Sequence, residues 1–132
     1  MQKVILLFLG GGLGTLIRWA ASGFVASRFG ELFPWGTLFV NVTGSFAIGF
    51  IATLTAPDGR LFLSPEARQF LMFGLLGGYT TFSSFSLQTL NLINDGEALL
   101  AIGNVLLSVF LCLVGVWLGH LIALKLNLLN WF

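Results

Sequence analysis

Charged side chains are scarce in this sequence. Asp, Glu, Lys and Arg make up 8% of its 132 residues, whereas soluble domains average about 25%. Apolar residues make up 57%, and the formal net charge is only +1. Such a composition cannot cover a soluble domain with charge, and the small net charge gives no reason to expect nucleic acid as a partner. We therefore predict an all-α integral membrane protein.

A second cysteine is missing from the sequence, and so are carboxylates within the spans. A single cysteine, Cys112, excludes an intrachain disulfide and a CxxC metal or redox motif. The five acidic residues all lie in or beside the expected loops. A proton-coupled transporter needs a carboxylate inside the membrane as its relay. The missing carboxylate argues against a small proton-coupled multidrug-type transporter, which we keep as the alternative function. Nothing in the sequence indicates an enzyme.

Four long apolar runs are present. At about 20 residues per span, they occupy roughly Val4–Ala26, Phe33–Ala56, Phe70–Ile93 and Ala98–Leu124. The connections between them are short and carry the turn and charge signals. No stretch remains for a soluble domain, so we expect a single four-helix transmembrane domain over residues 1–132.

Glycine pairs with a spacing of four residues predict tight helix packing. These pairs are Gly10 with Gly14, Gly74 with Gly78, and Gly115 with Gly119. The spacing does not say which helix or subunit is the partner. Because four helices bury few faces, we expect a polar route to form between subunits. A non-transporting subunit of a larger membrane complex is a third reading, for which these faces would suffice.

Polar residues gather in the third span, in the stretch GGYTTFSSFS from Gly77 to Ser86. Gly adds backbone freedom and hydroxyls compete for backbone partners, so we predict a break in the helix. A break frees backbone groups that are tolerated at membrane depth only if protein buries them or they bind something. Phe82 and Phe85 share one helical face, and the positive edges of their rings can seat an anion. Ordinary packing is the alternative for such a pair.

Three further polar side chains lie within the expected spans. Asn41 offers two N–H donors that suit an anion, although a hydrogen bond between helices is the more frequent use of a buried Asn. Arg18 is explained as readily by bonds to helix carbonyls as by a role in a pathway. For His120, near the end of the fourth span, we expect a structural role. With no carboxylate nearby, this neutral chemistry favours an anion over a cation.

Three motifs, GGGLGTLIRW, PWGTLFVNVTGSFAIGF and GLLGGYTTFSSFS, resemble the Fluc (CrcB) family of fluoride channels. The resemblance covers essentially the whole chain, and its second and third motifs are specific. It implies a passive channel that lets fluoride leave the cytoplasm through the cell inner membrane and so lowers fluoride toxicity. It also implies an antiparallel, dual-topology homodimer with two pores. Fluoride, membrane lipid and a second copy of the chain are then the expected partners.

The resemblance assigns the pore residues position by position. Asn41 is similar to the family's pore asparagine, and Phe82 and Phe85 are similar to the two phenylalanines that line the pores. Thr37 matches a polar position in the pore vestibule. Thr81 completes the expected set of hydroxyl donors in the third span.

The same resemblance implies a structural sodium ion at the dimer centre, bound by the backbone carbonyls of Gly77 and Thr80. Two breaks that face each other across a two-fold axis would form that site. The basic residues favour a cytoplasmic N-terminus, because only Arg28 falls on the far side from the other basic loop and terminal residues. That bias rests on few charges, so we retain the dual topology.

The fourth span matches the family only in part. Ser108 is similar to the first residue of a hydroxyl track described in some members. Cys112 and Val116 follow where those members have Ser and Thr, and Asn104 replaces a Tyr one turn before the track. The expected hydroxyl route along this helix therefore begins at Ser108 and is not continued.

Overall fold

A computed structural model of the chain describes residues 1–129. Four helical segments in it are long and apolar enough to cross a membrane: Gln2–Phe29, Trp35–Leu54, Pro65–Asn94 and Ala98–Leu128. Residues 1–129 form helices and loops, without a strand. The predicted all-α class and the predicted number of membrane-crossing helices are therefore confirmed.

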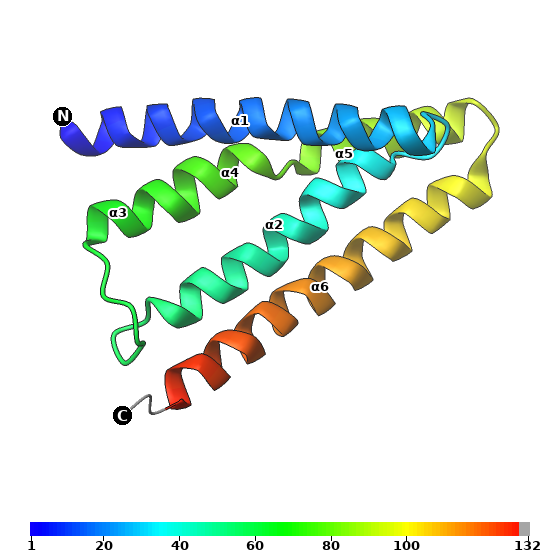
Figure 1. The fold of residues 1–132 in the computed structure, drawn as a ribbon. Coiled ribbons are helices and arrows are strands. Elements are labelled where there is room, and N and C mark those ends of the chain that lie inside the picture. The colour runs from blue at the N-terminus through cyan, green and yellow to red at the C-terminus, as the bar shows by residue number, and fades with distance from the viewer. Residues whose placement is uncertain (130–132) are drawn as a thin grey trace.

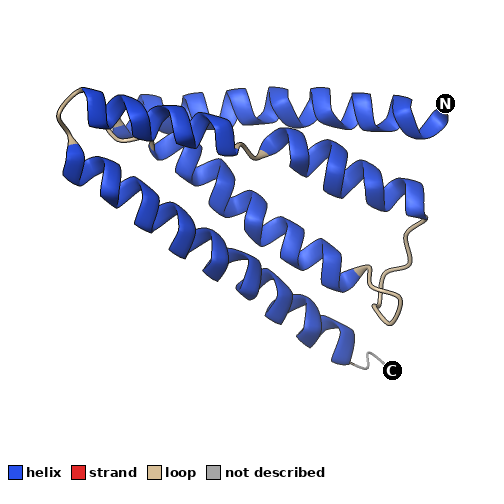
Figure 2. Ribbon diagram, turned by 180° about the vertical axis from the view of Figure 1, so that it is seen from behind, coloured by secondary structure: helices blue, strands red, loops and turns tan. Residues whose placement is uncertain are grey.

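The four spans run up and down and bring both termini to one end of the molecule. In chain order, the elements are α1 (Gln2–Phe29), α2 (Trp35–Leu54), α3 (Pro65–Gln69), the π-helix η1 (Phe70–Leu75), α4 (Leu76–Tyr79), α5 (Phe82–Asn94) and α6 (Ala98–Leu128). Figures 1 and 2 show the termini at the same end as the α2–α3 loop, which we call the termini end. The α1–α2 and α5–α6 connections lie at the opposite end. The helix α2 packs on α6 along much of its length, while α1 packs on η1 and α4.

The third span begins earlier than the sequence analysis placed it. Its first helix starts at Pro65, and the side chain of Ser64 accepts a hydrogen bond from the backbone N–H of Ala67 at 3.2 Å. Ser at the N-cap followed by Pro at the first helical position is a helix start signal that the sequence contains. Apolar composition alone had placed the start at Phe70, because the first turn is polar.

The glycine pairs pack within the chain. A Cβ on Gly10 would lie 3.1 Å from the Cα of Gly74, and one on Gly14 would meet the backbone carbonyl of Leu75. A Cβ on Gly119 would likewise meet the backbone of α2. The predicted tight packing is confirmed, and its partners are α1 against η1 and α4, and α6 against α2.

This packing makes a testable difference between neighbouring glycines of α1. We expect Gly14→Ala to lower the thermal unfolding temperature of the purified protein strongly, because the added methyl meets backbone atoms that cannot rotate away; overpacking of this kind costs about 1–3 kcal/mol or more. Gly12→Ala is the control, since among residues 1–129 nothing beyond its own helical turn lies within 4 Å of its Cβ position. Equal unfolding temperatures for the two variants would contradict this packing.

Polar contacts tie the spans together at the termini end. Lys3 forms an ion pair with Glu66 at 3.5 Å, which joins α1 to α3. The Nδ1 atom of His120 lies 2.7 Å from the hydroxyl of Thr53, which joins α6 to α2. This contact gives His120 the structural role that the sequence analysis expected.

Candidate functional site

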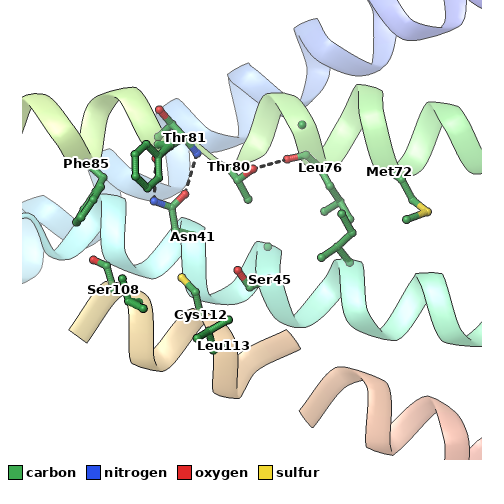
Figure 3. Close-up of a pocket in the computed structure, with 15 residues that line it drawn as sticks. Asn41, Ser45, Met72, Leu76, Thr80, Thr81, Phe85, Ser108, Cys112 and Leu113 are labelled. Carbon is green, nitrogen blue, oxygen red and sulfur yellow. Dashed lines mark hydrogen bonds between the residues drawn. The ribbon is translucent and has the colours of Figure 1, made fainter. Parts of the chain in front are cut away.

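A cavity of about 390 Å³ lies between α2, the α4–α5 segment and α6, and we call it the central cavity. Figure 3 shows its wall. Seven of the eight predicted site residues line it: Asn41, Gly77, Thr80, Thr81, Phe82, Phe85 and Ser108. Thr37, the eighth, lines a separate cavity of about 420 Å³ near the α1–α2 loop. The sequence therefore grouped residues from three spans that the fold brings to one cavity.

Two extended residues divide the third span beside this cavity. The helix α4 ends at Tyr79, and Thr80 (φ −87°, ψ 160°) and Thr81 (φ −154°, ψ 119°) precede the start of α5 at Phe82. The N–H of Thr80 still donates to the carbonyl of Leu76 at 3.0 Å. Beyond that bond, the backbone leaves the helical ladder, so its polar groups need other partners.

Asn41 supplies those partners to Thr81. Its side-chain Oδ1 accepts from the N–H of Thr81 at 2.7 Å, and its Nδ2 donates to the carbonyl of Thr81 at 2.8 Å. One amide thus satisfies both polar groups of an extended residue at membrane depth (Figure 3). The hydrogen bond between helices that the sequence analysis weighed is present. It uses one of the two N–H donors, so the second is still free for a ligand.

Arg18 binds the other extended residue from the opposite helix. Its Nη1 donates to the carbonyl of Thr80 at 3.4 Å, and the side chain is half-buried on α1. The guanidinium therefore bonds to a backbone carbonyl that the helical ladder leaves free. This is the bond to a helix carbonyl that the sequence analysis considered for Arg18, and composition could not have named Thr80 as its partner.

The hydroxyl of Thr81 begins α5. Its Oγ1 accepts from the N–H of Ser84 at 3.2 Å and donates to the hydroxyl of Ser84 at 3.1 Å. An N-cap of this kind fixes where the helix starts. The first residue of α5, Phe82, lines the cavity, so the positive end of the α5 dipole lies at the cavity wall. A helix end of this sign favours an anion over a cation.

Phe82 and Phe85 form a close pair. Their ring centroids are 5.1 Å apart and the ring planes are tilted by 54°. The predicted shared face is therefore present. The two rings differ in exposure, because Phe85 is 8% exposed and Phe82 is 77% exposed. Within one chain, the cavity is thus open on the side of Phe82.

A second buried amide joins α5 to α6 behind these rings. Asn104 donates to the hydroxyl of Thr89 at 2.9 Å and accepts from the hydroxyl of Ser108 at 3.4 Å. Thr89 in turn donates to the carbonyl of Phe85 at 2.8 Å. The sequence analysis noted Asn104 only as a departure from the family pattern. Its place in mid-span was a readable signal for a second link between helices.

The chemistry of the central cavity is neutral. The residues that line it include an amide, hydroxyls, a thiol and two phenyl rings, and none of them carries a charge. Donors of this kind can replace the water around an anion, whereas a cation would find no negatively charged side chain among the residues of the cavity wall.

Comparison with known proteins identifies the family of this chain. A sequence model of the family described as "CrcB-like protein, Camphor Resistance (CrcB)" matches residues 5–120. The chain belongs to the CrcB family. This confirms the resemblance that the three motifs indicated, and with the four spans it makes the chain a multi-pass membrane protein.

Several CrcB-family relatives are similar over nearly their whole length. A protein from Opitutus terrae named "Fluoride-specific ion channel FluC" is 60% identical over 98% of this chain and 98% of its own. Proteins of the same name from Rhodospirillum rubrum and Methylocella silvestris are 57% and 53% identical, over 89% and 92% of this chain and 92% of each of theirs. The names of these relatives describe ion channels and not enzymes.

Proposed function

We propose that this CrcB-family protein is a passive, fluoride-selective channel that lets fluoride leave the cytoplasm. The observation that carries this function is the central cavity, where an amide, hydroxyls and a phenyl pair meet without any charged side chain. We take fluoride as the transported ion because the relatives are named fluoride-specific ion channels. We place the channel in the cell inner membrane, with lipid around its many exposed apolar side chains.

Selection of fluoride follows from the donors. Fluoride holds its water strongly, so a pore must offer N–H and O–H groups and ring edges in exchange. Asn41 has one N–H that Thr81 does not use, and Phe82 and Phe85 lie within reach of the same cavity. A narrow route then excludes chloride, because chloride is larger than fluoride and forms weaker hydrogen bonds. The channel needs no chemical step, only an electrochemical gradient.

A growth assay tests this function in cells. Expression of the chain in bacteria that lack their own fluoride exporter should restore growth in fluoride. Collapse of the proton gradient should leave fluoride release from these cells intact, whereas a proton-coupled transporter would stop. The cavity supports the channel, because no carboxylate lines it. Loss of release together with the proton gradient would favour the transporter instead.

We propose that two copies assemble as an antiparallel, dual-topology homodimer. The cavity is open at Phe82, whose ring is 77% exposed, and a membrane route for a hydrated anion cannot be open to lipid. Gly77 supports this assembly, because within residues 1–129, its own helical turn apart, the atom nearest to its Cβ position is the Met72 carbonyl oxygen at 3.9 Å. A glycine that is not needed for packing inside one chain is available for close approach by another.

The same segment fits a structural sodium ion. In a continuous helix the carbonyl of Gly77 would accept from the N–H of Thr81, but that N–H donates to Asn41. The carbonyl of Thr80 accepts from Arg18 at 3.4 Å and keeps a second lone pair. Carbonyl oxygens suit a small hard cation. We propose that Gly77 and Thr80 hold sodium in the dimer, where its charge would offset part of the cost of nearby anions.

Substitutions at these two positions test the dimer and the ion site together. We expect Gly77→Val to reduce dimer formation and fluoride release, because its side chain would enter the open edge of the central cavity, where we propose that the second copy packs. Gly103→Val is the control, since its Cβ position is also open but lies on α6 outside the cavity. Thr80→Ser should be mild, because it changes no backbone carbonyl. Gel filtration and sodium-dependent flux are the measurements, and equal behaviour of both valine variants would contradict the proposal.

The dual topology predicts two orientations in one membrane. A tag placed at the N-terminus should be accessible from both faces in a single active preparation. Added lysines beside the tag should drive the chains to one orientation and lower fluoride release, since basic residues set topology. A fully active preparation with all tags on one face would overturn the antiparallel arrangement.

A further inference from the structure

Most hydroxyl protons of the central cavity are already donated within the protein. An anion binds to protons, so the number of polar groups matters less than the number of free donors. Three hydroxyls of the cavity wall have acceptors: Thr80 donates to the carbonyl of Leu76 at 2.9 Å, Thr81 to the hydroxyl of Ser84 at 3.1 Å, and Ser108 to the side chain of Asn104 at 3.4 Å. These groups shape the cavity, and in this structure their hydroxyl protons point to acceptors within the protein.

Two donors on α2 are left. Asn41 gives one N–H to Thr81 and keeps the other. Ser45 lies four residues further along, on the same face of the helix, and lines the same cavity. Helical hydroxyls commonly donate to the carbonyl four residues back, as Thr43 and Thr53 of the same helix do. Within residues 1–129, the hydroxyl of Ser45 donates neither to the carbonyl of Asn41 four residues back nor to any other group.

The opposite wall carries a thiol at this level. Cys112 of α6 lines the cavity together with Asn41 and Ser45, and Figure 3 draws its sulfur on the side of α6 that faces α2. A thiol is a weak donor compared with a hydroxyl. A chain of strong donors therefore cannot continue along α6 from Ser108, whereas α2 offers two donors one turn apart.

We infer that Ser45 is a fluoride-binding residue and that the ion passes along α2, from Asn41 to Ser45. This inference rests on the proposed fluoride channel. A free hydroxyl suits the ion, because an O–H that donates to an anion forms a short, charge-assisted hydrogen bond. Ser45 of α2 thus supplies the hydroxyl donor that Cys112 of α6 does not offer on the other side of the cavity.

Fluoride release from liposomes tests the role of Ser45. We expect Ser45→Ala to slow release at least roughly tenfold, which is the order expected for loss of one charge-assisted bond. Ser45→Thr should stay near the wild-type rate because it keeps the hydroxyl. Ser27→Ala is the matched control, since Ser27 lies on α1 outside the cavity and its hydroxyl already donates to the Phe24 carbonyl at 2.7 Å. Thermal unfolding should not differ between these variants.

A second substitution tests the link across the cavity. In the Ser45→Ala background, Cys112→Ser should restore part of the lost rate, because it returns a hydroxyl to the same cavity. If the Ser45→Ala protein releases fluoride at the wild-type rate, or if Ser45→Thr is as slow as Ser45→Ala, the role of Ser45 is overturned. If Cys112→Ser does not raise the rate in the Ser45→Ala background, a hydroxyl on α6 cannot replace the hydroxyl on α2, and that part of the inference is overturned. A wild-type protein that releases no fluoride would instead overturn the proposed channel.

Discussion

Asn41→Asp is expected to abolish fluoride release from liposomes. A carboxylate can accept from the N–H of Thr81, but it has no proton for the Thr81 carbonyl, which Asn41 binds at 2.8 Å. It also removes the free N–H and places a negative charge beside the route of an anion. A charged Asp at the centre of a span also costs about 3 kcal/mol of insertion free energy, so assembly is measured alongside release.

The control for this variant is Asn94→Asp. Asn94 is exposed at the end of α5, outside both cavities, so the same change of side chain should leave release within about twofold of wild type, as is usual for surface substitutions. Gel filtration of both variants separates loss of transport from loss of assembly. Normal release by an assembled Asn41→Asp protein would remove Asn41 from the pore.

Phe82→Ile is expected to give the second largest loss of transport. Isoleucine keeps a large apolar side chain but has no ring edge, and aromatic contacts are worth about 0.5–1.5 kcal/mol each. We expect release to fall about tenfold, since 1.4 kcal/mol is a factor of ten in rate. The ring of Phe82 is 77% exposed in one chain, so its replacement should not unfold that chain. Phe85→Ile should lower release as well, with some loss of stability because Phe85 is buried.

Phe8→Ile provides a control of equal exposure. Phe8 of α1 is also 77% exposed and does not line either cavity. Its replacement should leave both release and thermal unfolding unchanged. If Phe82→Ile transports as fast as Phe8→Ile, the ring of Phe82 serves packing and the quadrupole argument fails.

Composition and spacing predicted the parts of this fold that depend on local pattern. The four spans follow from apolar runs, and the Phe82–Phe85 pair follows from helical spacing, since residues three apart always share a face. The same reasoning found Asn41, because an amide at membrane depth must have a partner. These inferences need no knowledge of which helices are neighbours.

The partners themselves could not be predicted, because they depend on packing between distant segments. Nothing near Arg18 in the sequence points to the carbonyl of Thr80, which is 62 residues away. The π-helical turn of η1 leaves no pattern in an apolar stretch, and the bonds of Asn41 to Thr81, 40 residues away, become visible only in the structure. The donor inventory of the cavity therefore required coordinates, and so did Ser45, which the sequence analysis did not name.

The most direct test of the proposed channel is fluoride release from liposomes that contain only this purified protein. A fluoride electrode follows the ion after a potassium ionophore removes the opposing voltage, and a chloride electrode follows a parallel sample. The proposed function predicts rapid loss of trapped fluoride, retention of chloride, and no dependence on a proton gradient. Retention of fluoride by liposomes that hold folded protein, or equal loss of chloride and fluoride, would contradict it.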